Sequence, residues 1–315
     1  SKHDYDLLEW QHEPSPCEMT LILQQPRAKH PTPGHPQLVK KALRSAMIEP
    51  PDSRTAPEPA MSDSSANASP IIVRTLREAN CAECALNPVC LPPAVEDSHL
   101  DQLDNIIERN RPLQRGNHLF HERQPFEAVY AVRSGAIKAY TTLPGGEEQV
   151  TGFYLPGEIV GLDAISSGHH ASSAVALETT AVCTIPFPDL EKLSMEIPGL
   201  QHHFFKLMSK EIQSDQQLMV LLSKRSAEER IASLLLSLSA RHKRRRLSDA
   251  SFRLPMSRSD IGNFLGLAVE TVSRIFTRFQ QMGVLDVVGK EITILDREQL
   301  CQLAEPVNEL KASRA

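Results

Sequence analysis

Between residues 100 and 187, short apolar runs alternate with turn-forming residues, and this alternation restricts the possible folds more than any other feature of the chain. The apolar runs cover residues 129–133, 137–140, 149–154 and 182–185. Turn-forming segments that contain glycine lie at residues 134–135, 144–146 and 156–157. Regularly spaced short strands with such turns are typical of an antiparallel barrel or jelly roll. We therefore expect a β-roll here, preceded by a helix over residues 100–109.

A long helix is expected over residues 199–224, because the pattern changes after Pro198 and Gly199. One stripe of this helix recurs at alternating spacings of three and four residues and consists of Phe205, Met208, Ile212, Asp215, Met219 and Leu222. Such a seam is typical of two helices that pack against each other, so it predicts a homodimer. A second stripe can pack on the helix's own domain and consists of Phe204, Leu207, Leu218 and Leu221. The alternative is that both stripes belong to the core of one chain.

Asp215 is the one charged residue of the expected dimer seam. In a parallel pair of helices the two copies of Asp215 would approach each other, and like charges that lose water repel. We therefore expect a weak seam, so that a bound cofactor can control whether two chains associate through it. The alternative is that Asp215 lies at the edge of the seam with its carboxylate in water.

Residues 257–282 have the pattern of a helix-turn-helix. Ser257 is a candidate N-cap for a short helix that ends at Leu265, and residues 266–268 predict a tight turn before a second helix over residues 269–282. In the second helix Val272, Phe276 and Phe279 share one apolar face. The opposite face carries Glu270, Ser273, Arg274, Thr277 and Arg278. A helix with an apolar back and a polar front is what the major groove of DNA accepts, although a plain helical hairpin is the alternative.

The polar front predicts specific contacts with DNA. Arg274 can form a bidentate pair with guanine, Glu270 can accept from cytosine, and Ser273 can touch a thymine edge or a phosphate. Beyond the second helix, residues 285–288 and 291–294 predict a two-stranded wing whose Lys290 is placed for a phosphate. The expected partner is therefore double-stranded DNA, with a palindromic operator for a homodimer.

Charge is distributed unevenly along the chain. The net charge is -5, yet residues 224–315 contain sixteen Lys and Arg against eleven Asp and Glu. A basic C-terminal part favours a polyanion partner. We expect the basic run at residues 242–246 to be a solvated loop, with weak attraction to phosphates as the alternative.

The first 75 residues contain eleven of the 23 prolines and are expected to form a disordered extension. We expect a cysteine loop and β-roll sensor over residues 76–198, a DNA-binding domain over residues 225–305 and a tail at residues 306–315. The sequence has no apolar run long enough to span a membrane and no secretory pattern, so we expect a cytoplasmic protein without a membrane partner.

Six cysteines in a reducing compartment favour metal or redox chemistry over disulfides. Cys81, Cys84 and Cys90 form a C-x2-C-x5-C loop, and iron–sulfur clusters take four cysteine ligands. Cys183 is the preferred fourth ligand because it lies in an expected strand, whereas Cys17 falls in the extension and Cys301 beyond the wing. Zinc remains an alternative, although its sites usually pair two short cysteine hooks.

These motifs together resemble the fumarate–nitrate reduction regulators, within the cyclic-AMP receptor protein superfamily, and most of all their pseudomonad anaerobic regulator branch. The resemblance extends from about residue 81 to 304 and is carried by the cysteine loop and by residues 131–135, 148–153, 176–179, 221–224, 227–230 and 262–274. It implies an α+β fold with an N-terminal β-roll (jelly-roll) sensor domain, a long dimerisation helix and a C-terminal winged helix-turn-helix.

The resemblance also implies a [4Fe-4S] cluster that supports the dimer without oxygen and is lost when oxygen arrives. It further implies that Glu270, Ser273 and Arg274 bind a TTGAT-like half-site. The alternatives are a structural-zinc or small-ligand-gated regulator and an iron–sulfur redox enzyme. We expect no enzyme, because no catalytic constellation is present.

The same comparison with the superfamily indicates whether the chain binds a cyclic nucleotide. Ser172 stands where a cyclic-nucleotide pocket would place an arginine for the phosphate, and the sequence around Asp163 also departs from the pattern of such a pocket. No cyclic nucleotide is therefore expected. Separately, surface loops such as residues 144–148 are candidate contacts with RNA polymerase, with an ordinary exposed turn as the alternative.

Overall fold

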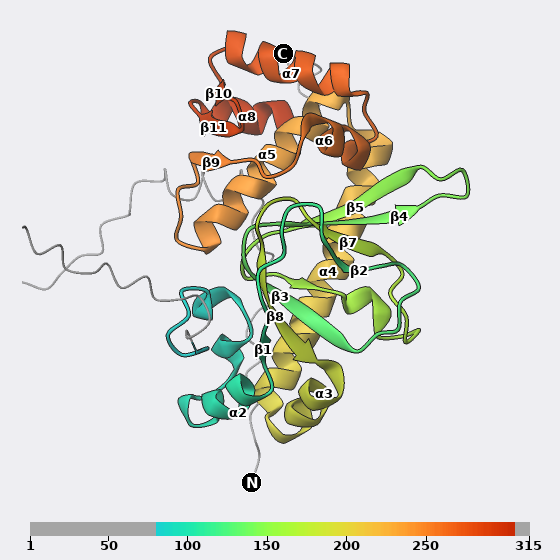
Figure 1. Ribbon diagram of the computed structural model, residues 1–315. Coiled ribbons are helices and arrows are strands. Elements are labelled where there is room, and N and C mark those ends of the chain that lie inside the picture. The colour runs from blue at the N-terminus through green and yellow to red at the C-terminus, as the bar shows by residue number, and fades with distance from the viewer. Residues whose placement is uncertain (1–79, 306–315) are drawn as a thin grey trace, which may run out of the picture.

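The computed structural model describes residues 80–305 of the 315-residue chain. The expected extension at residues 1–75, the tail at residues 306–315 and Cys17 lie outside the described residues. Two β-sheets pack around the middle of a long helix, and a helical C-terminal domain lies beyond its far end (Figure 1). Within the described range, no helix combines the length and apolar character needed to cross a bilayer.

The β-roll consists of two four-stranded antiparallel sheets, with strand orders β1-β8-β3-β6 and β2-β7-β4-β5. The strands are β1 (Glu108–Arg109), β2 (His118–Phe120), β3 (Ala128–Ser134), β4 (Ile137–Thr142), β5 (Glu148–Tyr154), β6 (Ile159–Val160), β7 (Ser173–Ala176) and β8 (Ala181–Pro186). The turn between β3 and β4 requires Gly135, whose φ is +79° and whose missing Cβ would lie 2.4 Å from Thr180 Oγ1. The predicted fold class is confirmed.

The predicted helix over residues 100–109 is wrong in its second half. Helix α2 (Leu100–Asn105) ends early, and Glu108 and Arg109 form strand β1 instead. Ile106 and Ile107 between them pack against the buried core. The chain becomes extended because β8 offers unpaired backbone groups along its edge, and Arg109 pairs there with Cys183. Four short 3-10 turns lie at Asn87–Val89, Pro92–Ala94, Asp97–His99 and Leu162–Ala164.

Helix α3 (Phe187–Glu196) leads into α4 (Pro198–Lys224), which runs the length of the β-roll (Figure 1). Phe204 and Leu207 of the second stripe pack against the core of the roll, as expected. The dimer stripe faces outward: Phe205 is 56% exposed, Ile212 59% and Met219 69%. Homodimer formation through this stripe remains a prediction.

The C-terminal domain contains α5 (Ala227–Arg244), β9 (Ser251–Arg253), α6 (Arg258–Leu265), α7 (Val269–Gln281), β10 (Leu285–Val288), β11 (Glu291–Ile294) and α8 (Arg297–Ala304). The expected cap at Ser257 is present: its hydroxyl accepts from the Asp260 backbone N–H, and the Asp260 carboxylate accepts from the Ser257 N–H. Strand β9 pairs with β11 and adds an unexpected third strand to the wing.

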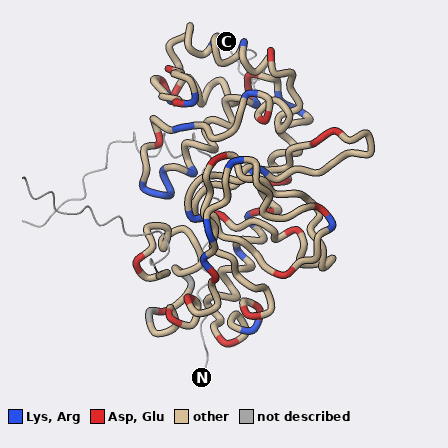
Figure 2. The backbone as a smooth tube through the Cα atoms, viewed as in Figure 1, with Lys and Arg blue, Asp and Glu red and all other residues tan. Residues whose placement is uncertain are grey.

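The basic run at residues 242–246 is not simply a loop, because α5 continues to Arg244. Figure 2 shows this basic turn in blue at the end of α5. Cations in a last helical turn complement the negative end of the helix dipole. The His242 ring also stacks on Phe252 with centroids 4.8 Å apart, which holds the turn against the wing.

Candidate functional site

The cysteine loop is folded back on itself by its own backbone. The Asn87 N–H donates to the Cys84 carbonyl at 2.9 Å, and the Cys90 N–H donates to the Leu86 carbonyl at 3.0 Å. The Asn87 side-chain amide donates to the Cys81 carbonyl at 3.2 Å. These bonds close a compact turn that directs several thiols toward one side.

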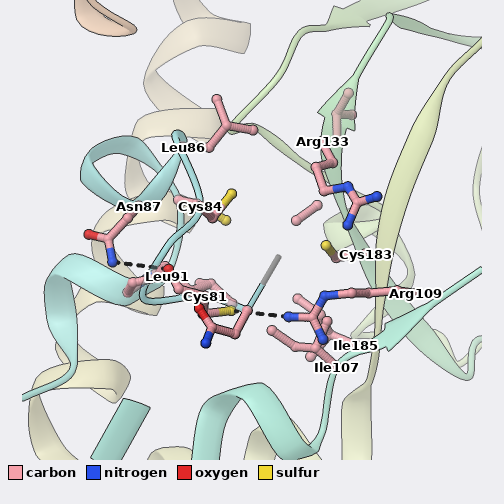
Figure 3. A pocket seen from close by; sticks show the side chains of 15 residues that line it. Cys81, Cys84, Leu86, Asn87, Leu91, Ile107, Arg109, Arg133, Cys183 and Ile185 are labelled. Atoms are coloured by element: carbon pink, nitrogen blue, oxygen red, sulfur yellow. Dashed lines mark hydrogen bonds between the residues drawn. The ribbon is translucent and has the colours of Figure 1, made fainter. Parts of the chain in front are cut away.

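One pocket collects all four expected ligands. Cys81, Cys84 and Cys90 reach it from the loop, and Cys183 reaches it from strand β8 across the pocket (Figure 3). The remaining lining is mostly apolar and includes Leu86, Leu91, Ile107 and Ile185. Cys301 is buried instead in the core of the C-terminal domain. All five of these cysteines are free thiols.

The thiols share the pocket without closing around a single point. Among residues 80–305, no three Cys, His, Asp or Glu side chains are grouped closely enough to hold one metal ion.

Burial favours the protonated form of Cys81, Cys90 and Cys183. It raises the pKa of Cys81 to about 12, with a further contribution from a hydrogen bond to Asp104. Burial also raises the pKa of Cys90 to about 12, and it raises the pKa of Cys183 above its usual range while Arg109 and Arg133 act in the opposite direction. The thiolate is the form that binds metal, so loading this pocket would release protons.

Two arginines of the pocket were not predicted from the sequence. Arg109 lies directly opposite Cys183 in the β1–β8 pair, and its Nη2 is 3.8 Å from Cys81 Sγ. The same guanidinium forms an ion pair with Asp104, which accepts from the Cys81 backbone N–H at 2.8 Å. Arg133 lines the pocket from β3 (Figure 3). Only the register in which β1 and β3 pair with β8 places these two arginines at the pocket. The sequence pattern does not reveal that register.

Helix α7 has the two faces expected of a recognition helix. Val272, Ile275, Phe276 and Phe279 are buried, whereas Glu270, Ser273, Arg274, Thr277 and Arg278 are exposed. A left-handed Gly266, with φ +64°, makes the turn between α6 and α7. The front is thus open to a partner over about two helical turns.

Five of the six predicted DNA-contact residues also have partners within the chain. The hydroxyls of Ser273 and Thr277 donate to carbonyls of their own helix. Arg278 forms an ion pair with Glu228 at the start of α5. Lys290, in the turn of the wing, donates to the Pro255 carbonyl at 2.7 Å. Arg274 makes a longer contact, at 3.4 Å, with the Glu270 carbonyl in its own helix. Arg274 therefore keeps most of its guanidinium available for DNA.

Comparison with known proteins supports this description of two functional regions. Residues 229–303 match the Crp-like helix-turn-helix domain family, and residues 110–196 match the cyclic nucleotide-binding domain family. Ser172 and Asp163 lie within residues 110–196 and differ from the sequence pattern of a cyclic-nucleotide pocket. The Ser172 Oγ donates a hydrogen bond to the Asp163 carboxylate at 2.9 Å, so these two side chains bind each other.

Close relatives align over most of the described chain. The chain is 53% identical over 234 residues to the transcriptional activator protein anr of Pseudomonas aeruginosa, covering 74% of this chain and 96% of that protein. It is 49% identical over 237 residues to the fumarate and nitrate reduction regulatory protein of Escherichia coli (strain K12), covering 74% and 95%. The solved structure of FixK2 from Bradyrhizobium japonicum matches with a TM-score of 0.59 and 30% identity, covering 64% of this chain and 98% of that one.

The relatives are transcription regulators and not enzymes, and the resemblance seen in the sequence is confirmed. The chain belongs to the family of Anr and fumarate and nitrate reduction regulatory proteins, which are Crp-type transcription regulators with a helix-turn-helix DNA-binding domain.

Proposed function

We propose that this transcription regulator senses oxygen through a [4Fe-4S] cluster bound by Cys81, Cys84, Cys90 and Cys183. The observation that carries the proposal is the convergence of these four thiols, from a loop and a distant strand, on one largely apolar pocket (Figure 3). Iron–sulfur clusters take four cysteine ligands, and this pocket offers four thiols. The residues present therefore fit the group.

The pocket is connected to the dimer helix through the cysteine loop. His203 on α4 hydrogen-bonds the Cys90 carbonyl at 3.1 Å, and the Cys81 N–H is held by Asp104. When bound, the cluster would supply an oxygen-labile cross-link between this loop and strand β8. Through His203, the position of the loop would bear on the surface that α4 offers to a second copy. The loop's own support consists of backbone bonds, the side chains of Asn87 and Asp104, and the packing of the buried Leu91.

The output of the proposed switch is DNA binding by a homodimer. Exposed apolar side chains along α4 support association of two copies, and the exposed face of α7 supports contact with the major groove. Glu270, Ser273 and Arg274 then recognise a TTGAT-like half-site, and the dimer recognises the palindrome. The regulator acts in the cytoplasm, contacts RNA polymerase, responds to no cyclic nucleotide and activates genes of anaerobic metabolism.

Anaerobic reconstitution with iron and sulfide tests the cluster. The loaded chain should be coloured, should contain about four irons and four sulfides per chain, and should lose its visible absorption and its operator affinity in air. Cys183→Ser should lose iron and sulfide, whereas Cys301→Ser, a matched buried thiol outside the pocket, should retain both. A colourless zinc protein that binds its operator equally well in air would contradict the proposal.

A further inference from the structure

Two arginine side chains direct unpaired N–H groups into the cysteine pocket. Six buried side-chain nitrogen or oxygen atoms in the described chain have no hydrogen-bond partner, and three of them are Arg109 Nε, Arg133 Nε and Arg133 Nη1. Both residues line the pocket; the Arg133 guanidinium points toward Cys183 and the Arg109 guanidinium toward Cys81 (Figure 3). Buried N–H donors are almost always paired, so unpaired ones at one place need an explanation.

The strand register places both arginines beside the same thiol. Arg109 is the direct cross-strand partner of Cys183 on β1, while Ala131 is its partner on the other side, on β3. Arg133 follows two residues after Ala131, where the β3–β8 pairing is interrupted by a bulge between Val132 and Ser134. Because side chains alternate along a strand, Arg133 lies on the same face of β3 as Ala131, which is the face of Cys183. Arg133 accordingly lines the pocket.

The two arginines differ in how far their charge is balanced. Arg109 has an acidic partner in Asp104, which also holds the Cys81 backbone. For Arg133, no ion pair and no hydrogen bond of the side chain is present within residues 80–305. Arg133 is half-buried, but its Nε and Nη1 are buried, and N–H groups that lose water without gaining a partner are unfavourable. The chain retains a charge here that its own residues do not neutralise.

A negatively charged occupant would remove this penalty. Four cysteine thiolates carry four negative charges, and the apolar side chains around them supply no compensation. We propose that Arg133, assisted by Arg109, is a positioning residue that balances the negative charge of the thiolate-bound cluster and donates N–H groups to its sulfur atoms. This inference rests on the proposed function, since it assigns partners to the same cluster.

The proposal makes opposite predictions for the empty and the loaded protein. In the cluster-free chain, removing the uncompensated charge relieves a penalty, so Arg133→Met should melt at the same temperature as the wild type or higher. In the loaded chain the same substitution removes a favourable partner, so the cluster should be held less firmly. A purely structural arginine would lower the stability of both forms, which makes the two roles distinguishable.

The experiment compares iron release from reconstituted full-length protein to a chelator, under strict anaerobiosis. Arg133→Met should release iron roughly tenfold faster than the wild type, the range expected when a residue that supports metal ligands is lost. Arg133→Lys, which retains the charge but loses the fixed fork of N–H donors, should release iron more slowly than Arg133→Met. Arg245→Met is the matched control, because Arg245 also has a buried, unpaired Nε but does not line the pocket.

Iron release from Arg133→Met at the wild-type rate, or a lower melting temperature for its cluster-free form, would overturn the assignment. Equal acceleration in Arg245→Met would overturn it as well. If the wild type itself took up no iron and sulfide, the proposed function would fail and this inference with it. The iron and sulfide content of the wild type therefore separates the two failures.

Discussion

Lys138 Nζ lies 3.2 Å from a carboxylate oxygen of Asp260 and so joins the β-roll to the first helix of the helix-turn-helix. Lys138 is on β4, and Asp260 is the third residue of α6, whose carboxylate completes the capping box with the N-cap Ser257. Both side chains are largely buried, with 13% and 18% of their surface exposed. Glu148 on β5 is a second partner of the same ammonium, at 3.1 Å.

An amide contact reinforces this ion pair. Asn263 Oδ1 accepts from the Val150 N–H at 2.5 Å, and Asn263 Nδ2 donates to the Glu148 carbonyl at 2.6 Å. The side chain thus bonds to the edge of β5 much as a neighbouring strand would. Together the two contacts fix the DNA-binding domain against the sensor sheet.

Replacing Lys138 should weaken this junction. Lys138→Met should lower the free energy of unfolding by about 1–3 kcal/mol, because two carboxylates lose a largely buried, charged hydrogen-bond partner. The control is Arg253→Met, whose ion pair with Glu178 also joins the two domains but is more exposed. The Arg253→Met substitution should lower the free energy of unfolding by less than about 1 kcal/mol. Chemical unfolding of both variants measures the difference, and equal losses would contradict the assignment.

The junction should also weaken in acid. Burial alone would raise the pKa of Asp260, but hydrogen bonds from Ser257 and the charge of Lys138 bring it below its usual value. A lowered folded-state pKa stabilises the fold above the unfolded value near 4, and this contribution is lost as the pH falls through the folded-state value. Asp260→Asn should therefore lose less stability than the wild type between about pH 5 and pH 3.

Unfolding curves across this range test the acid prediction. Asp104 and Glu229 also have lowered pKa values and will contribute to the acid response of both proteins. The quantity to compare is thus the difference between the wild type and the Asp260→Asn variant. A difference that does not change with pH would rule out a titrating Asp260.

The recognition helix could be predicted because its burial follows the helical period. Val272, Phe276 and Phe279 recur on one face, and the sequence displays that spacing directly. Strand β1 could not be predicted in the same way, since two residues carry no period. It exists only because Glu108 and Arg109 pair with β8, a contact between segments more than seventy residues apart.

The residues of the cysteine pocket also differ in whether the sequence could predict them. The loop cysteines could be assigned from their spacing, and Cys183 from its expected strand. Arg109 and Arg133 could not, because both depend on the register in which β1 and β3 pair with β8. Long-range pairing of this kind is determined by packing between strands, which leaves no local signal.

Arg274 and Lys290 should differ in their effects on DNA binding. Arg274→Ala should weaken binding to the matched operator by about 1–3 kcal/mol and relax the preference for one guanine, because a bidentate base contact is lost. Lys290→Ala should weaken binding to all sequences alike and lower the salt slope by about one. Titrations on matched and mismatched operators at several salt concentrations compare the two.

Lys290 needs one additional control because its ammonium also donates to the Pro255 carbonyl. The melting temperature of Lys290→Ala shows whether the wing has lost its support. Arg274→Ala serves as the comparison, since its side chain is exposed and bonds only within its own helix. If both variants lost the same affinity for matched and mismatched DNA, the base contact assigned to Arg274 would be wrong.

Asp215 should oppose dimerisation. It is exposed on α4 in the single chain, on the same stripe as the exposed Ile212 and Met219. Even there, partial burial raises the pKa of its carboxyl above the usual value. Glu211, one turn earlier, is also acidic and its pKa is likewise raised, mainly by burial, while Tyr154 donates a hydrogen bond to it. A second copy of the helix would remove further water from this acidic segment.

Asp215→Ala should therefore tighten the dimer of the cluster-free protein by on the order of tenfold, or about 1.4 kcal/mol, and should permit operator binding in air. Removing the carboxylate eliminates both the repulsion between the two copies and the cost of desolvating each one. Gln217→Ala is the control, because Gln217 is exposed on the same helix but lies outside the seam. Sedimentation and operator titration in air measure both effects. A variant that remained as monomeric as the wild type would exclude Asp215 as the source of the weak seam.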